Sequence, residues 1–276
     1  MKNSDNNKHA RVLVKSDRKG SNPGGFCSYN NGRDNFEGYL KYCFGSKIPR
    51  NLSYLRSDHQ PIYEAITFEL ARKFGLKTPD FFVLKNQDNH VEFEDPEKFS
   101  PHTHSGRPFY FISRKIHEPA LPNLDQIGSE IISKQKVYLE SLMIADILGK
   151  RQNYHILPRG NDFDVYYLDL GCSFVHATGG FIHLPNELKT YSRNCDTKRD
   201  RCNLKGKAVV GSDNKSFVDL EKLTSSFEDL AIPVLGSSPM PLSDLISSEE
   251  IEEISSYLIH GLCKGISMYK EQGLLI

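Results

Sequence analysis

Apolar residues form short, strand-like runs in the first part of the chain and recur at helical spacing afterwards. The runs predict five strands, at about 10–14, 26–29, 36–44, 81–84 and 109–112. A four-residue apolar repeat from Ile62 to Phe74 predicts a helix over about 59–74. Asp58 is the candidate cap of this helix, and Gly75 is expected to end it.

The pattern after Pro119 is mostly helical. Three helices are expected, over 129–148, about 217–231 and about 248–271. The last of them has a candidate capping box, formed by Ser247 and Glu250. Two short strands are expected on either side of Gly160-Asn161-Asp162.

These elements together predict an α+β fold with a cleft between two parts. The polar segment 1–9 is expected to be disordered, 10–118 to form a strand-rich part and 119–276 a helical part. Within the helical part, residues 176–216 are rich in Gly, Asn and basic side chains and are expected to form a loop.

Composition narrows the classes of function. The 276 residues carry 35 basic and 35 acidic side chains, a balance that argues against bulk attraction to nucleic acid or to a membrane surface. No apolar run reaches membrane-spanning length, and residues 1–10 lack the apolar core of a secretory signal. The six dispersed cysteines favour a reducing, cytoplasmic location, with delivery into another cell by a specialised route left open. Cys195 and Cys202 are the one pair considered for a metal or a disulfide.

A single lysine, Lys41, lies in the apolar run 39–44. An ammonium group among aromatic side chains is costly unless it meets an anion. The candidate anions are nucleotide phosphates and Glu64 on the following helix, with Glu69 as a second carboxylate. The alternative is an edge strand from which Lys41 reaches solvent, with Glu64 solvated as well.

A turn-rich loop, Lys19-Gly20-Ser21-Asn22-Pro23-Gly24-Gly25, lies between the first two predicted strands. Small residues such as Gly20, Gly24 and Gly25 let backbone N–H groups approach a phosphate closely. No Gly-Lys-Ser/Thr follows, so the loop is not a Walker A motif. It is either a phosphate-binding loop or a surface turn.

Asp169 follows the strand-like run Val165-Tyr166-Tyr167 and precedes Gly171. A carboxylate at a strand end, held by a flexible turn, can bind the Mg²⁺ that bridges nucleotide phosphates. The sequence therefore predicts a metal site at Asp169.

In this order, these segments resemble the atypical branch of the kinase superfamily, which includes HipA-type toxin kinases and phosphoinositide-kinase-like proteins. The resemblance covers roughly residues 10–175. It implies a two-lobed protein-kinase-like fold that uses ATP and Mg²⁺ and transfers phosphate to a protein Ser or Thr, with a lipid as the alternative acceptor. It further implies that the glycine loop covers the phosphates, Lys41 contacts them, Glu64 orients Lys41 and Asp169 holds the metal.

The chain departs from this family at the catalytic loop, where the family has D-R-H-x-x-N. Matching the following apolar pair puts Lys150 at the Asp position and His155 at the Asn position. Counting from Asp146 instead puts Asn153-Tyr154-His155 on D-R-H and Pro158 on the metal-binding Asn. No Asp lies between 147 and 161, so neither alignment keeps both functional residues.

The replacements suggest different chemistry for each residue. Lys150 can neutralise phosphate charge, and Asn153 can position a hydroxyl without taking its proton. His155 can act as a base near neutral pH, or it can be a packed histidine beside a strand.

Three hypotheses remain: a protein kinase with a non-standard loop, a pseudokinase that works as a binding or regulatory module, and an enzyme of nucleotidyl transfer. The basic loop 176–216 can attract an acidic or phosphorylated protein partner or simply be solvated.

Overall fold

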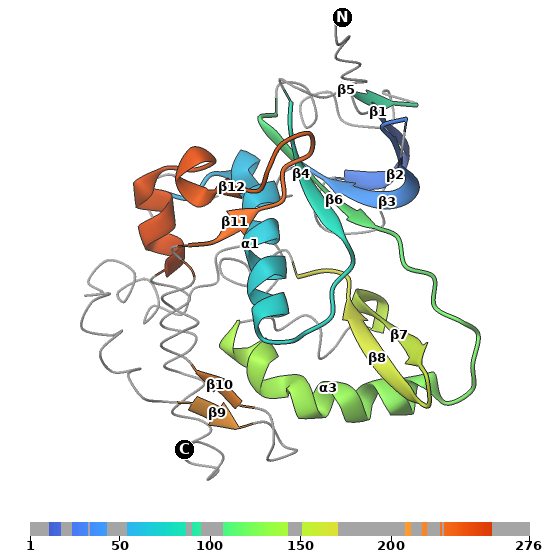
Figure 1. Cartoon of the computed structure of the whole chain (residues 1–276). Coiled ribbons are helices and arrows are strands. Elements are labelled where there is room, and N and C mark those ends of the chain that lie inside the picture. The colour runs from blue at the N-terminus through green and yellow to red at the C-terminus, as the bar shows by residue number, and fades with distance from the viewer. Residues whose placement is uncertain are drawn as a thin grey trace, which may run out of the picture.

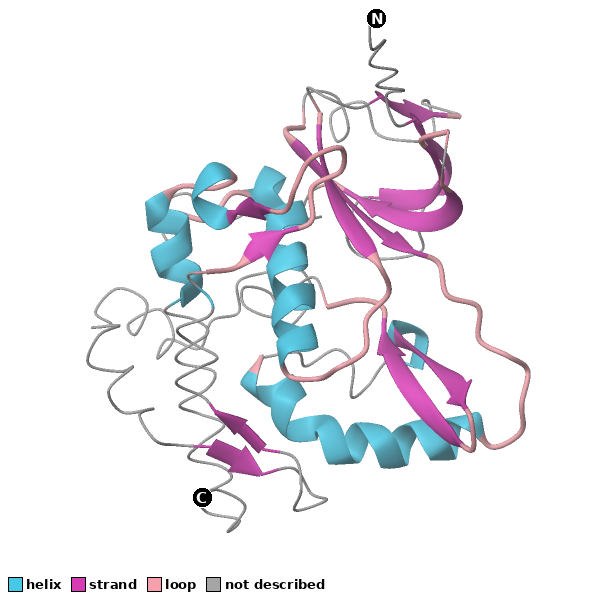
Figure 2. Cartoon of the chain, viewed as in Figure 1, coloured by secondary structure: helices cyan, strands magenta, loops and turns pink. Residues whose placement is uncertain are grey.

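The computed structural model of the protein describes residues 11–17, 24–32, 34–42, 54–86, 90–94, 107–142, 151–170, 208–210, 217–219, 227 and 229–255. The fold is α+β, as predicted, with a curled sheet and few helices. Figures 1 and 2 show one helix, α1, standing between the sheet and a helical segment near the C-terminus. A second helix, α3, crosses beyond the C-terminal end of α1.

The sheet has six strands: β1 (Arg11–Asp17), β2 (Gly24–Asn30), β3 (Asn35–Lys41), β4 (Phe81–Lys85), β5 (His90–Phe93) and β6 (Phe109–Arg114). Their order is β4-β6-β3-β2-β1-β5. Neighbours are antiparallel, except that β5 runs parallel to β1. All five predicted strands are present. The prediction missed β5, because four residues at the edge of a sheet carry too short an alternation to stand out.

Both faces of this sheet bury apolar side chains. One face packs against α1 through residues such as Val83, Phe109 and Phe111. The other face encloses a smaller cluster that contains Leu40 and Tyr42. Successive side chains of a strand point to opposite faces of the sheet. The residue between Leu40 and Tyr42 therefore points toward α1.

Helix α1 (Gln60–Lys73) follows a short 3-10 turn, η1 (Ser57–His59). The predicted cap is wrong: His59 is the N-cap residue, and the Asp58 carboxylate accepts hydrogen bonds from Arg56 instead. The predicted end is confirmed, because Gly75 adopts φ +80°, a conformation that favours glycine. Most of the helix is buried, including three polar residues that require partners: Gln60, Glu64 and Thr67.

Helix α3 (Leu124–Ser141) begins five residues before the predicted start at 129, and residues 143–150 lie outside the described chain. An 18-residue helix built on a weakly apolar sequence has no sharp start signal, so the boundary was wrong. At Gly128 the helix packs so closely on β7 that a Cβ would lie 2.5 Å from the Ile156 side chain.

The predicted pair of short strands is confirmed. A 3-10 turn, η2 (Arg151–Asn153), leads into β7 (Tyr154–Arg159), which pairs with β8 (Asp162–Tyr167). Gly160 forms the turn between them with φ +61°. The hairpin also touches the loop after α1, where the Tyr167 backbone N–H donates to the Lys77 carbonyl at 2.9 Å.

The C-terminal part contains β9 (Ala208–Val210), β10 (Phe217–Asp219), β11 (Ala231–Ile232), β12 (Met240–Pro241), η3 (Leu242–Asp244) and a helix over 248–255. The helix predicted over 217–231 is therefore wrong at both ends, and the loop predicted over 176–216 contains a strand. Pairing between the consecutive short strands β9 and β10, in which Phe217 lies opposite Val210, outweighed the local helical pattern.

The predicted capping box is confirmed at the start of the helix over 248–255. The Ser247 N–H donates to Glu250 Oε2 at 3.1 Å, and the Glu250 N–H donates to Ser247 Oγ at 3.3 Å. No described helix is long and apolar enough to cross a membrane.

Candidate functional site

Lys41 ends β3 and lies on the face of the sheet that α1 covers, between Leu40 and Tyr42, which belong to the opposite cluster. Only 2% of its side chain is exposed. Strands β2 and β6 flank β3 on either side, so the alternative of an edge-strand lysine that reaches solvent is wrong. A buried ammonium in this position needs anionic partners.

The first partner is Glu64, which is fully buried on α1. The Lys41 Nζ donates a hydrogen bond to Glu64 Oε1. The other carboxylate oxygen, Oε2, accepts from the Gln60 amide Nε2 at 2.5 Å. Glu69 is not a partner of Lys41; it binds Arg72 on the same helix at 3.2 Å. Two side chains therefore hold the Glu64 carboxylate, one from the sheet and one from its own helix.

The second partner is Asp169, 128 residues further along the chain. The Lys41 Nζ donates to Asp169 Oδ1 at 2.7 Å. The Asp169 side chain is 29% exposed, whereas Glu64 is completely buried. One ammonium group thus joins a structural carboxylate to a second carboxylate that solvent reaches.

Asp169 sits between two anchored residues. The Leu168 N–H donates to the Asn153 carbonyl at 2.8 Å, and the Leu170 side chain is 1% exposed in the main core. The carboxylate is therefore placed by the end of β8 and by core packing. Gly171, which the sequence suggested as the flexible turn, lies outside the described residues.

The glycines of the predicted loop divide into two groups. Gly24 and Gly25 belong to β2 and pair with Lys41 and Leu40 of β3. Their placement in a loop was wrong, because the β2 ladder extends further than its apolar run. A Cβ at Gly24 would lie 2.0 Å from the Leu40 carbonyl oxygen, so this close approach of two strands requires glycine. Gly20 lies outside the described residues, in the connection from β1 to β2 that ends beside Lys41.

Asn153 ends η2 and is buried next to the backbone of Leu168. The turn that carries it is held by Arg151, whose guanidinium donates to both Glu118 oxygens at 2.7 and 2.8 Å and to Asp125 at 2.6 Å. Asn153 therefore lies close in space to the segment that presents Asp169. Lys150, the residue before this turn, lies outside the described part of the chain.

His155 is half-buried in β7 and is engaged by a different segment. Its Nδ1 lies 3.0 Å from the Ile116 carbonyl oxygen, a distance at which the protonated nitrogen donates a hydrogen bond. Burial lowers the pKa of His155, so the ring is neutral at pH 7. It alternates with Tyr154 and Ile156, which belong to the main core. This environment is that of the packed histidine rather than of a base beside Asp169.

The charges of the site suit a divalent cation bound together with phosphate. In their ionised forms, Glu64 and Asp169 leave one negative charge in excess over Lys41. Within the described ranges, no three His, Cys, Asp or Glu side chains lie close enough to form a metal cage. Mg²⁺ does not need such a cage, because it is bound by one or two carboxylates plus phosphate oxygens and water. The donor set around Asp169 fits that kind of binding.

Sequence reasoning missed three residues that shape the site: Gln60, Arg151 and Glu118. Gln60 precedes Glu64 by four positions, and this spacing on a predicted helix was a usable signal for a contact. Arg151 and Glu118 are 33 positions apart in different elements, and no local pattern links them.

Comparisons with known proteins do not assign the chain to a family. No protein-family model, no curated protein and no solved structure gives a significant match to it.

Proposed function

We propose that this protein is a kinase-like phosphotransferase that binds ATP with Mg²⁺ beside Lys41 and transfers the γ-phosphoryl group to a protein Ser or Thr. The single observation that carries the proposal is the position of the Lys41 amine, which donates to both Glu64 and Asp169. A strand lysine, a helix glutamate and a metal-binding aspartate are the three side chains that protein kinases assemble around the phosphates.

The order of the elements also supports the proposal. Lys41 lies on the third strand, the helix with Glu64 follows it, and Asp169 comes just after a hairpin. The connection between the first two strands ends at Gly24, which pairs directly with Lys41. In the proposal, residues 18–23, which lie outside the described chain, cover the phosphates that Lys41 contacts. In the proposed two-lobed arrangement, β1–β6 with α1 form one lobe, and α3 with the β7–β8 hairpin begins the other.

The missing aspartate in the catalytic loop does not by itself exclude phosphoryl transfer. The transition state is loose, so positioning and charge stabilisation contribute more than proton removal. Asn153, whose backbone carbonyl contacts the Asp169 segment, is the described residue that we propose for orienting a substrate hydroxyl. His155 is not proposed for this role, because its ring is turned to the Ile116 carbonyl.

A pseudokinase is the second candidate function, favoured by one specific observation. The chain has no Asp between 147 and 161, and His155 in the same segment serves packing. In that case the site would bind nucleotide in order to shape a surface for a protein partner.

Radiolabelled ATP separates these functions. Purified protein is incubated with Mg²⁺ and with ATP labelled at either the γ or the α phosphorus, with and without a general protein substrate. We expect label from γ-labelled ATP in the wild-type protein and at least a hundredfold less in Asp169→Asn, since the variant lacks the metal-binding carboxylate. Asp162→Asn, an exposed change in β8, is the matched control and should label normally.

Each other outcome supports a different function. Label from α-labelled ATP alone would replace phosphoryl transfer by nucleotidyl transfer. A Mg²⁺·ATP-dependent rise in melting temperature without label would establish the pseudokinase. If both the label and the rise in melting temperature are absent, nucleotide binding at Lys41 is overturned.

A further inference from the structure

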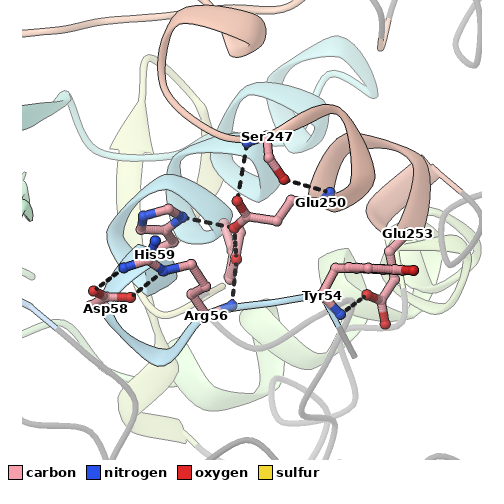
Figure 3. A network of polar contacts seen from close by, with 8 residues as sticks. Tyr54, Arg56, Asp58, His59, Ser247, Glu250 and Glu253 are labelled. Atoms are coloured by element: carbon pink, nitrogen blue, oxygen red, sulfur yellow. Dashed lines mark hydrogen bonds and ion pairs between the residues drawn. The ribbon is translucent and has the colours of Figure 1, made fainter. Parts of the chain in front are cut away.

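A second buried carboxylate, Glu250, contacts the start of α1 on a stripe next to the one that carries Glu64. It belongs to the helix over 248–255 and is 2% exposed. Figure 3 shows it among Tyr54, Arg56, Asp58, His59, Ser247 and Glu253. Its Oε1 lies 2.7 Å from His59 Nδ1 and also accepts a hydrogen bond from the Tyr63 hydroxyl. Its Oε2 accepts from the Ser247 N–H. His59, Tyr63 and Ser247 thus converge on one carboxylate that links the C-terminal part to the start of α1.

The residues that contact Glu250 interleave with those that hold Lys41. His59 and Tyr63 are four positions apart and contact Glu250, while Gln60 and Glu64 are four positions apart and contact each other. The two pairs form neighbouring stripes on the first turn of the same helix. A movement of this turn away from Glu250 therefore displaces Glu64 relative to Lys41.

The segment before this turn is tied to the same cluster. Within the described residues, no side chain caps the N-terminus of α1, whose N-cap residue is His59 itself. The Tyr63 hydroxyl also accepts the Arg56 N–H at 2.9 Å, so the segment before the helix is tied to the same cluster. The Tyr54 N–H donates to Glu253 Oε2 at 2.7 Å, a second tie between that segment and the C-terminal helix.

We propose that Glu250 is a positioning residue for the Lys41–Glu64 pair, acting through His59 and Tyr63 on the first turn of α1. A carboxylate supplied from about 190 positions away in the chain then determines whether the amine that faces Asp169 is correctly held. The effect of Glu250 on nucleotide affinity rests on the proposed function, whereas its effect on the position of the Lys41 amine does not.

The direct test measures how well the Lys41 amine is protected, without any nucleotide. A water-soluble N-hydroxysuccinimide ester acylates accessible amines, and mass spectrometry of a digest gives the rate at Lys41. Glu250→Ala should raise this rate at least tenfold, because α1 loses its anchor and the buried amine opens to solvent. Glu249→Ala, an exposed neighbour on the same helix, is the matched control and should leave the rate unchanged.

Cys27 distinguishes a shift of α1 from general unfolding. It is buried in the cluster on the opposite face of the sheet, and burial raises its pKa to about 12, so its thiol is inert in the folded protein. The proposal requires Lys41 to become reactive while Cys27 stays resistant to iodoacetamide. Equal exposure of both residues, or an unchanged Lys41, would overturn it.

Milder variants keep the proposal open to refutation if Glu250→Ala does not fold. Tyr63→Phe removes one hydroxyl and Glu250→Gln removes the charge, and each should raise Lys41 acylation about threefold or more. If both leave it unchanged, the positioning role is wrong.

Nucleotide binding separates this proposal from the proposed function. We expect Glu250→Gln to raise the KM for ATP more than it lowers kcat, because Lys41 contacts the bound phosphates. If the wild-type protein shows no response to Mg²⁺·ATP while Glu250→Ala still exposes Lys41, the phosphotransferase proposal fails and the positioning role stands.

Discussion

At the scale of single residues, the site depends on one ammonium group that sits between two carboxylates of different exposure. Glu64 has no contact with solvent, so its charge depends on Lys41 and on the amide of Gln60. A buried charge that loses its partner destabilises a protein strongly, whereas a buried pair replaced by apolar groups of similar size often does not. The contribution of Lys41 to stability can therefore be separated by mutation from the phosphate binding that we propose for it.

We expect Lys41→Met to lower the free energy of unfolding by about 3–5 kcal/mol, because the buried Glu64 carboxylate would lose the ammonium group that neutralises it. Adding Glu64→Met should restore most of this loss while leaving ATP unbound. Urea unfolding of both single variants and of the double variant measures the coupling. Strictly additive losses would contradict the assignment of a coupled pair.

A surface pair provides the control for this cycle. Lys115 and Glu37 lie 3.0 Å apart with side chains that are 27% and 57% exposed, so Lys115→Met should cost no more than about 1 kcal/mol.

At the scale of elements, α1 is the part that connects the sheet, the C-terminal helix and the site. One stripe of its first turn contacts Glu250, and the next stripe contacts Lys41. Strand β2 contributes a position without a side chain, Gly24, where two strands approach closely beside Lys41. The geometry of the site is therefore a property of how these elements pack, more than of any one residue.

The contacts around Glu250 predict an acid-sensitive contribution to stability. Burial by itself raises the pKa of Glu250, but hydrogen bonds from His59 and Tyr63 lower it, and the net pKa lies below the usual value of glutamate. Because the folded pKa is the lower one, the stabilisation is complete above the unfolded value of about 4.3 and is lost as the pH falls through the folded value.

The difference in unfolding free energy between wild type and Glu250→Gln should therefore be largest at neutral pH and shrink below about pH 4. Urea unfolding at pH 7, 5, 4 and 3 measures this difference. A difference that grows on acidification would show that the sign of the pKa shift is wrong.

At the scale of the whole molecule, one continuous hydrophobic core joins the parts that the proposed two-lobed arrangement assigns to different lobes. It includes Ile66 of α1, Leu139 of α3, Ile156 of β7 and Ile232 of β11. Ring contact between Phe74 and Tyr138, with centroids 5.4 Å apart, continues it from the end of α1 into α3. The described part of the chain should therefore unfold as one unit.

We expect Ile66→Ala and Ile156→Ala each to lower the stability by about 2–5 kcal/mol and to shift the same unfolding transition. Far-ultraviolet circular dichroism and tyrosine fluorescence should give coincident curves; the chain has 13 Tyr and no Trp. Two separate transitions, each sensitive to only one of the substitutions, would indicate independently folding lobes.

Local sequence signals were sufficient for many elements and for the candidate residues. The apolar run around Lys41 indicated a strand, the four-residue repeat indicated α1, and Ser247 with Glu250 indicated a helix start. These features depend on residues close together in the chain, where backbone geometry fixes which side chains meet. The signals failed for β5, which is stabilised by pairing with the distant strand β1, and for β9 and β10, two short neighbouring strands that pair with each other.

The order of residues along the chain was enough to identify a buried lysine that needs an anion, and carboxylates that could supply one. Burial of a charge has a cost that does not depend on the details of the fold. A lysine within an apolar run therefore indicates by itself that an anionic partner is needed. Folding decided which carboxylates meet Lys41 and that Glu250 contacts the start of the same helix. It also decided that His155 turns to the Ile116 carbonyl. Those contacts join residues from 39 to 191 positions apart, and only the packing of whole elements brings such distant residues together.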